Sequence, residues 1–149
     1  MNGHSRTLYL LDSNIFLRAL VRSNEVSWRE CTQLLRAVIE KRIPAYIPTI
    51  VVAEIQFVLT SFYGLEKHTI VKAMKSLAAM PNLQYIEDVS LAVALGYFEH
   101  YNVKFIDCLL ASSKLMQEGR GVIVSYDRDF DRLGIRRVEP GDLLKKQKQ

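Results

Sequence analysis

Cysteine and histidine are scarce in this chain. Among 149 residues there are two cysteines, Cys31 and Cys108, and three histidines that are scattered along the sequence. Two distant cysteines do not make a disulfide framework, and no His or Cys cluster has the spacing of a zinc site. Both cysteines lie in apolar, helix-like context, so we expect them to be buried, reduced thiols.

Long apolar runs are also absent. The most apolar region, AYIPTIVVAEIQFVL, is interrupted by Pro48 and Glu54, and no uncharged stretch approaches the length of a membrane span. The N-terminus shows no secretory pattern, because its short apolar run ends at Asp12. We therefore expect a cytoplasmic protein that does not bind a membrane.

The charge balance is mildly basic. There are 20 Lys and Arg residues against 16 Asp and Glu, which gives a net charge of +4. This excess permits an anionic partner such as nucleic acid without requiring one. Part of it lies in the final LLKKQKQ, which we interpret as a short basic tail, frayed from about residue 143. The length suits a single domain over residues 1–149 with one hydrophobic core.

Short β-like runs alternate with longer helical patterns. Strands are expected at 7–11, 45–48, 83–87 and 121–126, with an edge strand at 135–140. Helices are expected at 14–21, 27–42, 50–63, 66–80, 88–102 and 106–117, with short ones at 127–133 and 141–146. This alternation predicts an α/β fold with a mainly parallel sheet.

Several polar residues stand where helices should begin or end. Ser13 and Thr49 are expected N-caps, Asp88 is expected to open the helix over 88–102, and Gly64 should end the helix over 50–63. In the helix over 27–42, one apolar stripe is expected to face the core: Trp28, Cys31, Leu34, Leu35, Val38 and Ile39.

Four acidic residues lie in apolar surroundings at comparable places. Asp12 and Asp127 follow the first and fourth expected strands, at the end of the sheet where open α/β folds place their sites. Glu54 and Asp107 lie near the starts of helices. Asp12, Asp107 and Asp127 could singly be helix caps or first-turn acids. Glu54 is harder to explain in this way, because an unpaired glutamate among apolar residues costs several kcal/mol when buried. Together, the four residues favour one shared site.

Such a cluster needs neutralisation, because adjacent carboxylates repel one another and raise their own pKa values. A bound divalent cation would provide it. Carboxylate oxygens are ligands that suit Mg²⁺ or Mn²⁺. The acids therefore predict a magnesium or manganese site.

Four segments resemble, in order, the motifs of PIN-domain ribonucleases: YLLDSNIFLRAL, VVAEIQFVLTSFYGL, KFIDCLLASS and IVSYDRDFDRLGI. Among these proteins the chain looks most like the toxin subunit of VapBC-type toxin–antitoxin pairs. The resemblance implies a three-layer α/β/α sandwich with a central parallel sheet of four or five strands. It also implies an acidic pocket that holds Mg²⁺ or Mn²⁺.

The resemblance implies site residues as well. The catalytic and metal-binding acids are expected to be Asp12, Glu54, Asp107 and Asp127, with Asp129 as an auxiliary metal ligand. Supporting positions are Ser13, Asn14 and Ser125, the last of which is more often Thr in the family. Asp131 has no counterpart and is interpreted as a surface acid that offsets Arg128 or Arg132.

Basic residues must flank an acidic pocket that binds RNA. Lys104 and Arg128 lie nearest to the proposed ligands in sequence and are the favoured substrate contacts. Arg18, Arg22 and Arg132 are weaker candidates, because ordinary solvated charge explains them equally well.

The expected function is metal-dependent endoribonuclease activity on RNA, by a toxin that forms a homodimer and binds a small antitoxin protein. Val58, Phe62 and Tyr63 are expected at interfaces, and Phe57 in the core. A PIN-fold RNA-processing or ribosome-biogenesis nuclease without an antitoxin stays open, as does a catalytically silent binding module. A phosphotransferase with an Asp nucleophile is disfavoured, because Asn14 stands where a second Asp is needed.

Overall fold

A parallel sheet of five strands forms the centre of the computed structural model, which describes residues 6–149. The strands are β1 (Leu8–Leu11), β2 (Ala45–Ile47), β3 (Leu83–Tyr85), β4 (Gly121–Val124) and β5 (Arg137–Val138). Their order across the sheet is β3-β2-β1-β4-β5, and all four neighbouring pairs run parallel.

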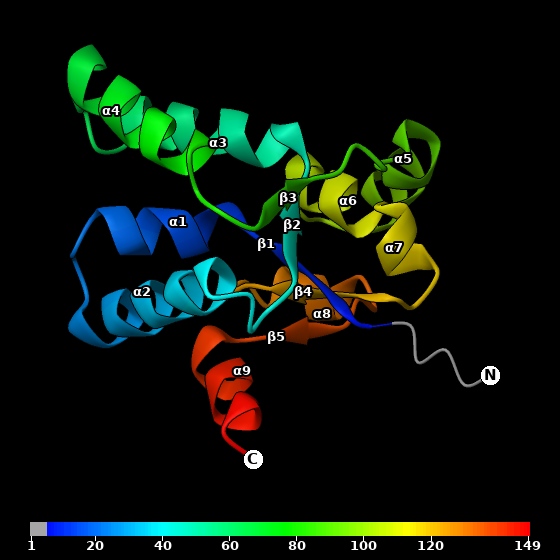
Figure 1. Cartoon of the computed structure of the whole chain (residues 1–149). Helices are drawn as coiled ribbons and strands as arrows, with labels where there is room; N and C mark the ends of the chain where they lie inside the picture. Colours follow the sequence, from blue (N-terminus) through cyan, green and yellow to red (C-terminus); the bar gives the residue numbers. More distant parts are fainter. Residues whose placement is uncertain (1–5) are drawn as a thin grey trace.

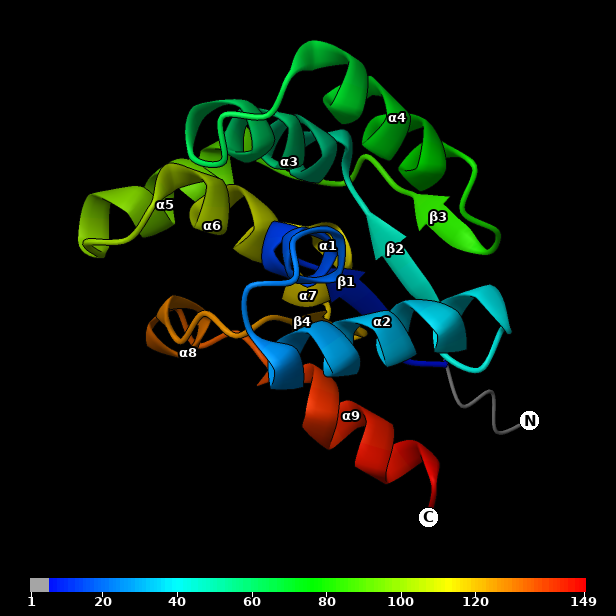
Figure 2. The ribbon, with the colours of Figure 1, turned by 90° about the vertical axis from the view of Figure 1, so that its left-hand side faces the viewer.

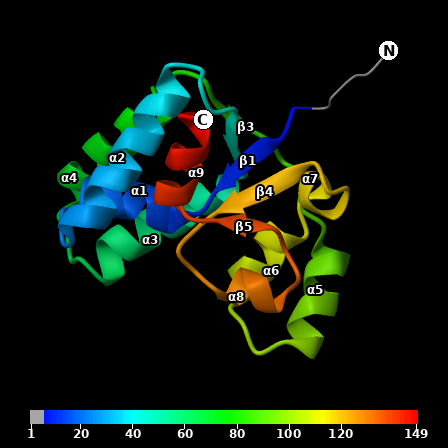
Figure 3. The same cartoon turned by 90° about the horizontal axis from the view of Figure 1, so that it is seen from below.

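Helices cover both faces of this sheet. They are α1 (Ser13–Leu20), α2 (Glu25–Ile39), α3 (Thr49–Ser61), α4 (Lys67–Ala78), α5 (Leu91–His100), α6 (Phe105–Ala111), α7 (Lys114–Gln117), α8 (Asp129–Arg132) and α9 (Pro140–Gln147) (Figure 1). Figure 3 shows α1, α2 and α4 on one side of the strands and α5, α6 and α7 on the other. The three-layer α/β/α sandwich is therefore confirmed.

The strands form from short runs that are buried on both faces. All residues of β2 and β4 are buried, as expected for central strands of a parallel sheet that helices cover. The core they share with the helices includes Leu10, Tyr46 and Ile123, none of which is exposed. Among the described residues, no helix combines the length and the apolarity that crossing a membrane demands.

The chain reverses its direction of progress across the sheet next to β1. Strand β2 pairs with one edge of β1, and β4 pairs with the other, so that Leu11 lies opposite Val124. Open α/β sheets bind ligands at such a switch point, outside the carboxyl ends of the strands. Figure 2 shows α3, α6 and α8 gathered around α1 at this end of the sheet.

The helix expected over 106–117 is instead two helices. Helix α6 ends at Ser112, whose hydroxyl donates to the Leu109 carbonyl oxygen at 2.7 Å, and α7 begins after Ser113. The carboxylate of Asp88 accepts hydrogen bonds from the Ser113 hydroxyl at 2.7 Å and from the Leu115 N–H at 3.1 Å. Asp88 therefore holds the start of α7 and does not open α5, which Ser90 caps by accepting from the Val93 N–H.

Two other expected caps are also wrong. Helix α1 is capped by Asp12, because its carboxylate accepts from the Ser13 N–H, and Ser13 is already helical. Thr49 is the first residue of α3, and its N–H donates to the Glu87 carboxylate at 2.7 Å. Gly64 follows the end of α3 at φ +61°, in the left-handed region that glycine favours.

The apolar stripe of α2 is narrower than expected. Cys31, Leu34 and Val38 are fully buried, whereas Trp28 is half-buried and Ile39 is 42% exposed. Ala37 completes the buried face in their place. A small residue at this position allows α2 to lie close to the elements beneath it.

The short helix expected over 141–146 is confirmed, and it includes residues 143–147, part of the tail expected to be frayed. Helix α9 runs from Pro140 to Gln147 and packs against α2. Leu143 is only 1% exposed, so this turn is held by apolar burial despite the lysines that follow it. Proline at the first helical position favours the start of the helix.

Candidate active site

Asp12 lies at the carboxyl end of β1, in a dense set of hydrogen bonds. One carboxylate oxygen accepts from the Ser13 N–H at 2.7 Å, and the other accepts from the Ser125 hydroxyl at 2.6 Å and from the Asn14 amide at 3.2 Å. Burial raises the pKa of Asp12 to about 6, the Ser125 hydrogen bond opposes that rise, and the charge of Glu54 adds to it. The three supporting residues expected from sequence therefore all contact or flank Asp12.

Glu54 reaches the site from the first turns of α3. Its carboxylate accepts a hydrogen bond from the Ser13 hydroxyl, which joins α3 to the start of α1. Glu54 is half-buried among Val51, Ile55 and Val58 of the same helix. Its charge also raises the pKa of Asp12 and of Asp107, so it belongs to the same electrostatic cluster.

Asp107 lies in the first turn of α6 and is only 4% exposed. Burial raises its pKa to about 8, with further increases from the charges of Asp12 and Asp127 and a decrease from Lys104. Among the described residues, its Oδ2 has no hydrogen-bond partner although the atom is buried. Leaving a buried carboxylate oxygen without a hydrogen-bond donor costs free energy, and most buried polar atoms in proteins do have a partner.

Asp127 and Asp129 complete the carboxylate group from the loop after β4 and from α8. The Asp127 N–H donates to the Ser125 hydroxyl at 3.0 Å, and the Asp129 N–H donates to an Asp127 carboxylate oxygen at 2.9 Å. Asp107, Asp127 and Asp129 each offer one oxygen, and these three oxygens lie within 4.8 Å of one another. We call these three residues the acid triad.

The structure thus divides the five expected acids into two adjoining groups. The acid triad could hold one ion, and Asp129, expected only as an auxiliary, is a full member of it. Asp12 and Glu54 are not part of the triad. Asp12 is occupied by Ser13, Asn14 and Ser125, and Glu54 is bound to Ser13.

The donor set of the triad fits a hard divalent cation. Three carboxylates supply only oxygen ligands, and the unpaired Asp107 Oδ2 is a buried acceptor without a donor. Mg²⁺ and Mn²⁺ prefer such oxygen ligands, and their charge would offset the repulsion that raises the pKa of Asp107. The residues present therefore fit the metal that the resemblance implies.

Two of the expected basic residues border this site. Lys104 precedes α6, is exposed, and lowers the pKa of Asp107. Arg128 is exposed between Asp127 and Asp129. Arg132, by contrast, donates to the Asn102 carbonyl oxygen and to Asp129, so its guanidinium already has partners.

Asp131 is exposed and its hydrogen-bond partner is Arg137, while the charge of Arg128 also lowers its pKa, as the sequence indicated. Its carboxylate accepts two hydrogen bonds from Arg137, each of 3.0 Å, and the pKa of Asp131 is lowered by them. Arg137, with a side chain only 12% exposed, also donates to the Ser125 carbonyl oxygen at 3.0 Å. The sequence did not predict this contact between Arg137 and the Ser125 backbone, because a basic residue on an edge strand shows no sign that it will be buried.

A model of the PIN domain family matches residues 9–136, and the chain belongs to the PIN domain family. The resemblance drawn from the four sequence motifs is thereby confirmed.

Solved structures of toxin–antitoxin proteins have a similar fold. VapBC2 from Rickettsia felis, bound to a DNA fragment from its promoter, is 19% identical with a TM-score of 0.62, over 89% of this chain and 98% of that chain. A toxin–antitoxin complex from Klebsiella pneumoniae is 20% identical with a TM-score of 0.59, over 89% and 97%. VapC20 from Mycobacterium tuberculosis, a sarcin–ricin loop cleaving toxin, is 14% identical with a TM-score of 0.61, over 87% and 98%. Among curated proteins, none matches this chain.

Proposed function

We propose that this protein is a metal-dependent endoribonuclease, the toxin of a cytoplasmic toxin–antitoxin pair. The observation that carries the proposal is the acid triad, in which one carboxylate oxygen from each residue lies within 4.8 Å of the other two, and in which Asp107 has a buried oxygen without a hydrogen-bond partner among the described residues. Membership of the PIN domain family supports nuclease chemistry at this position. The sarcin–ricin loop cleaving toxin with a similar fold supports RNA as the substrate class.

The chain's own residues hold and arrange the reacting groups. Asp107, Asp127 and Asp129 would bind Mg²⁺ or Mn²⁺, which when bound lowers the pKa of a coordinated water and neutralises charge on the phosphoryl oxygens. Asp12, whose pKa burial raises to about 6 when no metal is bound, adjoins the triad. Ser125 links the two groups, since it donates to Asp12 and accepts from the Asp127 N–H.

Lys104 and Arg128 are the proposed cations at the rim of the pocket. Both are exposed and adjoin triad residues in the chain, and Lys104 already acts on Asp107 electrostatically. Their charges would offset the repulsion between an acidic pocket and a phosphodiester backbone.

The antitoxin would bind an apolar groove on the helical layer of α1–α4. A groove of about 510 Å³ between α3 and α4 is lined by Leu65, Ile70, Val71 and Met74. Met74 also lines an adjoining groove with Phe16 and Leu35, so the apolar surface continues to α1 and α2. Its shape and apolarity suit one face of an amphipathic helix from a partner protein. Two of the similar folds come from toxin–antitoxin complexes.

The residues expected at interfaces lie in the last turns of α3 and just after it. Phe62 is 79% exposed, consistent with an interface role, while Val58 and Tyr63 are half-buried against the core. Phe57 was expected in the core, but it is 65% exposed. It lies on the solvent side of α3, since Val51, Ile55 and Leu59 fill the buried side.

A second copy of the chain would cover α5. Leu91, Leu95 and Phe98 repeat at helical spacing along one side of this helix and are 61%, 50% and 50% exposed. Only Ala94 of α5 is buried. An apolar stripe of this kind marks an interface, and we assign it to the homodimer. Light scattering should find a dimer for the parent and a monomer for Phe98→Glu.

The nuclease proposal is tested with purified protein and a mixed single-stranded RNA substrate. We expect cleavage that needs Mg²⁺ or Mn²⁺, stops with EDTA, and leaves 5′-phosphate ends. Asp107→Asn should abolish it, whereas Asp142→Asn, which changes an exposed acid on α9, should not. Cleavage by Asp107→Asn at the parent's rate would refute the proposal.

A further inference from the structure

Two arginines near the end of α1 lie over aromatic rings. The Arg18 guanidinium carbon is 4.5 Å from the centre of the Tyr126 ring, and that of Arg22 is 3.9 Å from the centre of the Trp28 ring. Such stacking holds a guanidinium in one orientation and leaves its edge free for hydrogen bonds. The two residues are therefore alike in the way that they are supported.

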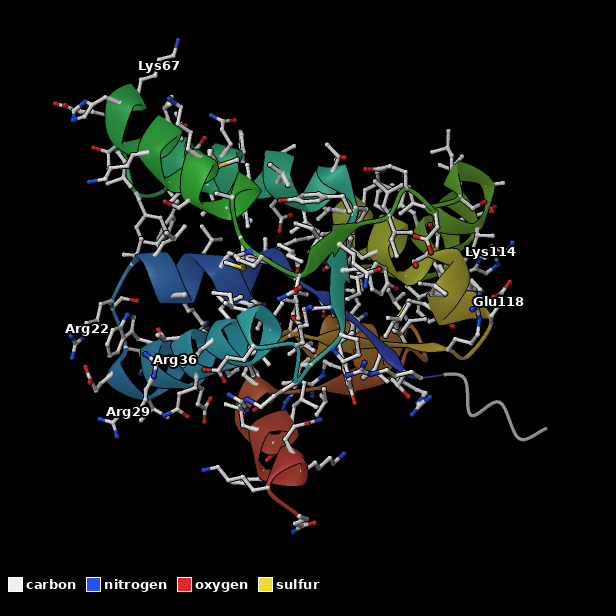
Figure 4. All side chains as sticks on the ribbon, viewed as in Figure 1. Arg22, Arg29, Arg36, Lys67, Lys114 and Glu118 are labelled. Carbon is white, nitrogen blue, oxygen red and sulfur yellow. The ribbon has the colours of Figure 1, made fainter. Side chains whose placement is uncertain are left out.

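They differ in how their charge is satisfied. Arg22 donates twice to the Glu25 carboxylate, at 2.9 and 3.0 Å, and Figure 4 shows it projecting outward beyond the helices. Arg18 is half-buried and donates to the Ser27 hydroxyl at 3.1 Å. Among the described residues, no carboxylate lies within 4.0 Å of the Arg18 guanidinium. Within residues 6–149, Arg18 therefore has no salt bridge.

The acid that could have paired with Arg18 is engaged elsewhere. Glu30 of α2 accepts a hydrogen bond of 2.6 Å from the Tyr126 hydroxyl, and this bond fixes the ring beneath Arg18. A carboxylate oxygen of Glu30 also occupies the space that a Cβ at position 141 would need. Glycine at the start of α9 leaves room for Glu30 there, near a helix N-terminus that favours a negative charge.

Arg18 is linked to the acid triad through the loop that follows β4. On α1 it follows Asn14 by one helical turn, about 6 Å along the axis. Asn14 donates to the Ser125 hydroxyl, and Arg18 stacks on Tyr126, the residue between Ser125 and Asp127. Helix α1 therefore runs alongside the loop that carries Asp127, and the Arg18 guanidinium extends the surface of the site away from the triad.

We infer that Arg18, held over the ring of Tyr126, binds a phosphate of the RNA strand next to the phosphate that is cleaved. The inference rests on the proposed nuclease function and adds a subsite to it. A guanidinium presents several N–H donors in one plane, the geometry that suits phosphate oxygens. A cation near the C-terminal end of α1 is favoured by the helix dipole. That preference alone does not explain why Arg18 is half-buried with no carboxylate partner among the described residues.

Salt-dependent binding tests this subsite. Binding of a fluorescent single-stranded RNA pool of random sequence is measured by anisotropy in the Asp107→Asn background, so that the RNA stays intact. Arg18→Met should weaken binding about tenfold, as expected for one charge-assisted hydrogen-bond contact. It should also reduce the slope of log affinity against log salt by roughly 0.7, the value for one phosphate on a single strand. Arg22→Met, the matched control, should change neither quantity.

Kinetics of the otherwise unaltered enzyme give a second measurement. Arg18→Met should raise KM and leave kcat unchanged, because the contact lies outside the reacting phosphate. Equal salt slopes for Arg18→Met and its parent would overturn the subsite. If Arg18→Met does not fold, Arg18→Lys decides: a retained slope with weaker binding supports the inference, and binding equal to the parent's overturns it. A parent that neither binds nor cleaves RNA would refute the nuclease proposal instead.

Discussion

Replacing Asp107 by Asn should make the metal-free protein more stable at neutral pH. In the folded protein, burial and the charges of Asp12 and Asp127 raise the pKa of Asp107 from 3.8 to about 8. A carboxyl group with a raised pKa contributes its full stability below pH 3.8 and loses it as the pH rises toward 8. An amide at position 107 has no proton to lose, so the variant escapes this loss.

The size of the effect follows from the pKa interval. Between 3.8 and neutral pH, about three units at about 1.4 kcal/mol each give an upper limit of roughly 4 kcal/mol. Relaxation of the site and penetration of water reduce that figure, and we expect about 1–2 kcal/mol in the free energy of unfolding.

Urea unfolding with EDTA present measures this difference. The two proteins should be similar at about pH 4, and Asp107→Asn should be more stable at about pH 7. Addition of Mg²⁺ should stabilise the parent but not the variant, because the ion binds the folded acid triad. If Asp107→Asn proves less stable than the parent at about pH 7 without metal, Asp107 is a structural acid and the reasoning fails.

Three further perturbations test other parts of the structure. Leu143→Ala should lower the free energy of unfolding by about 2–4 kcal/mol in urea titrations, because it leaves a cavity where a buried side chain of α9 packs. An unchanged free energy of unfolding would show that this end of the chain is frayed instead. Ser125→Ala should raise the pKa of Asp12 above about 6, because it removes a hydrogen bond that favours the charged form. Carboxyl NMR titration would measure the change, and an unchanged pKa would contradict this role of Ser125. Asp131→Asn should lower the melting temperature at neutral pH. The difference should vanish as the pH falls through the lowered pKa of Asp131, because the ion pair with Arg137 is then lost in the parent too.

The sheet was predictable because its strands are short apolar runs at regular spacing. Each of the five strands lies within an expected run, and the position of Asp12 and Asp127 after β1 and β4 follows from the run that precedes each. Parallel strands bring their carboxyl ends to one edge, so the approach of these acids was a consequence of topology.

Helix ends were harder to predict, because tertiary contacts decide them. The apolar periodicity continues through Ser112 and Ser113, and the sequence shows no reason for a break. The break exists because Ser112 accepts from the Ser90 N–H and Ser113 donates to Asp88, both of which lie in the loop before α5. Partners more than twenty residues away cannot be read from a local pattern.

The division of the acids was not predictable either. Asp12 accepts a hydrogen bond from Ser125, and Glu54 accepts one from Ser13. Both contacts depend on side-chain rotamers and on the distance between α1 and α3, which the sequence does not show. The sequence likewise placed Arg18 and Arg22 in one class. Only their surroundings separate them, because Glu25 lies within reach of one and not of the other.

The pairing of β1 with β4 has a consequence for the synthesis of this protein. Asp12 and Ser125 touch in the folded molecule, yet they are 113 residues apart in the chain. Closing so long a loop costs conformational entropy, and it can happen only after the residues between Asp12 and Ser125 have been synthesised. A ribosome must therefore synthesise the residues through Ser125 before Asp12 can bind that distant partner. A product that stops short of β4 lacks Asp127 and Asp129 altogether, so it cannot form the acid triad.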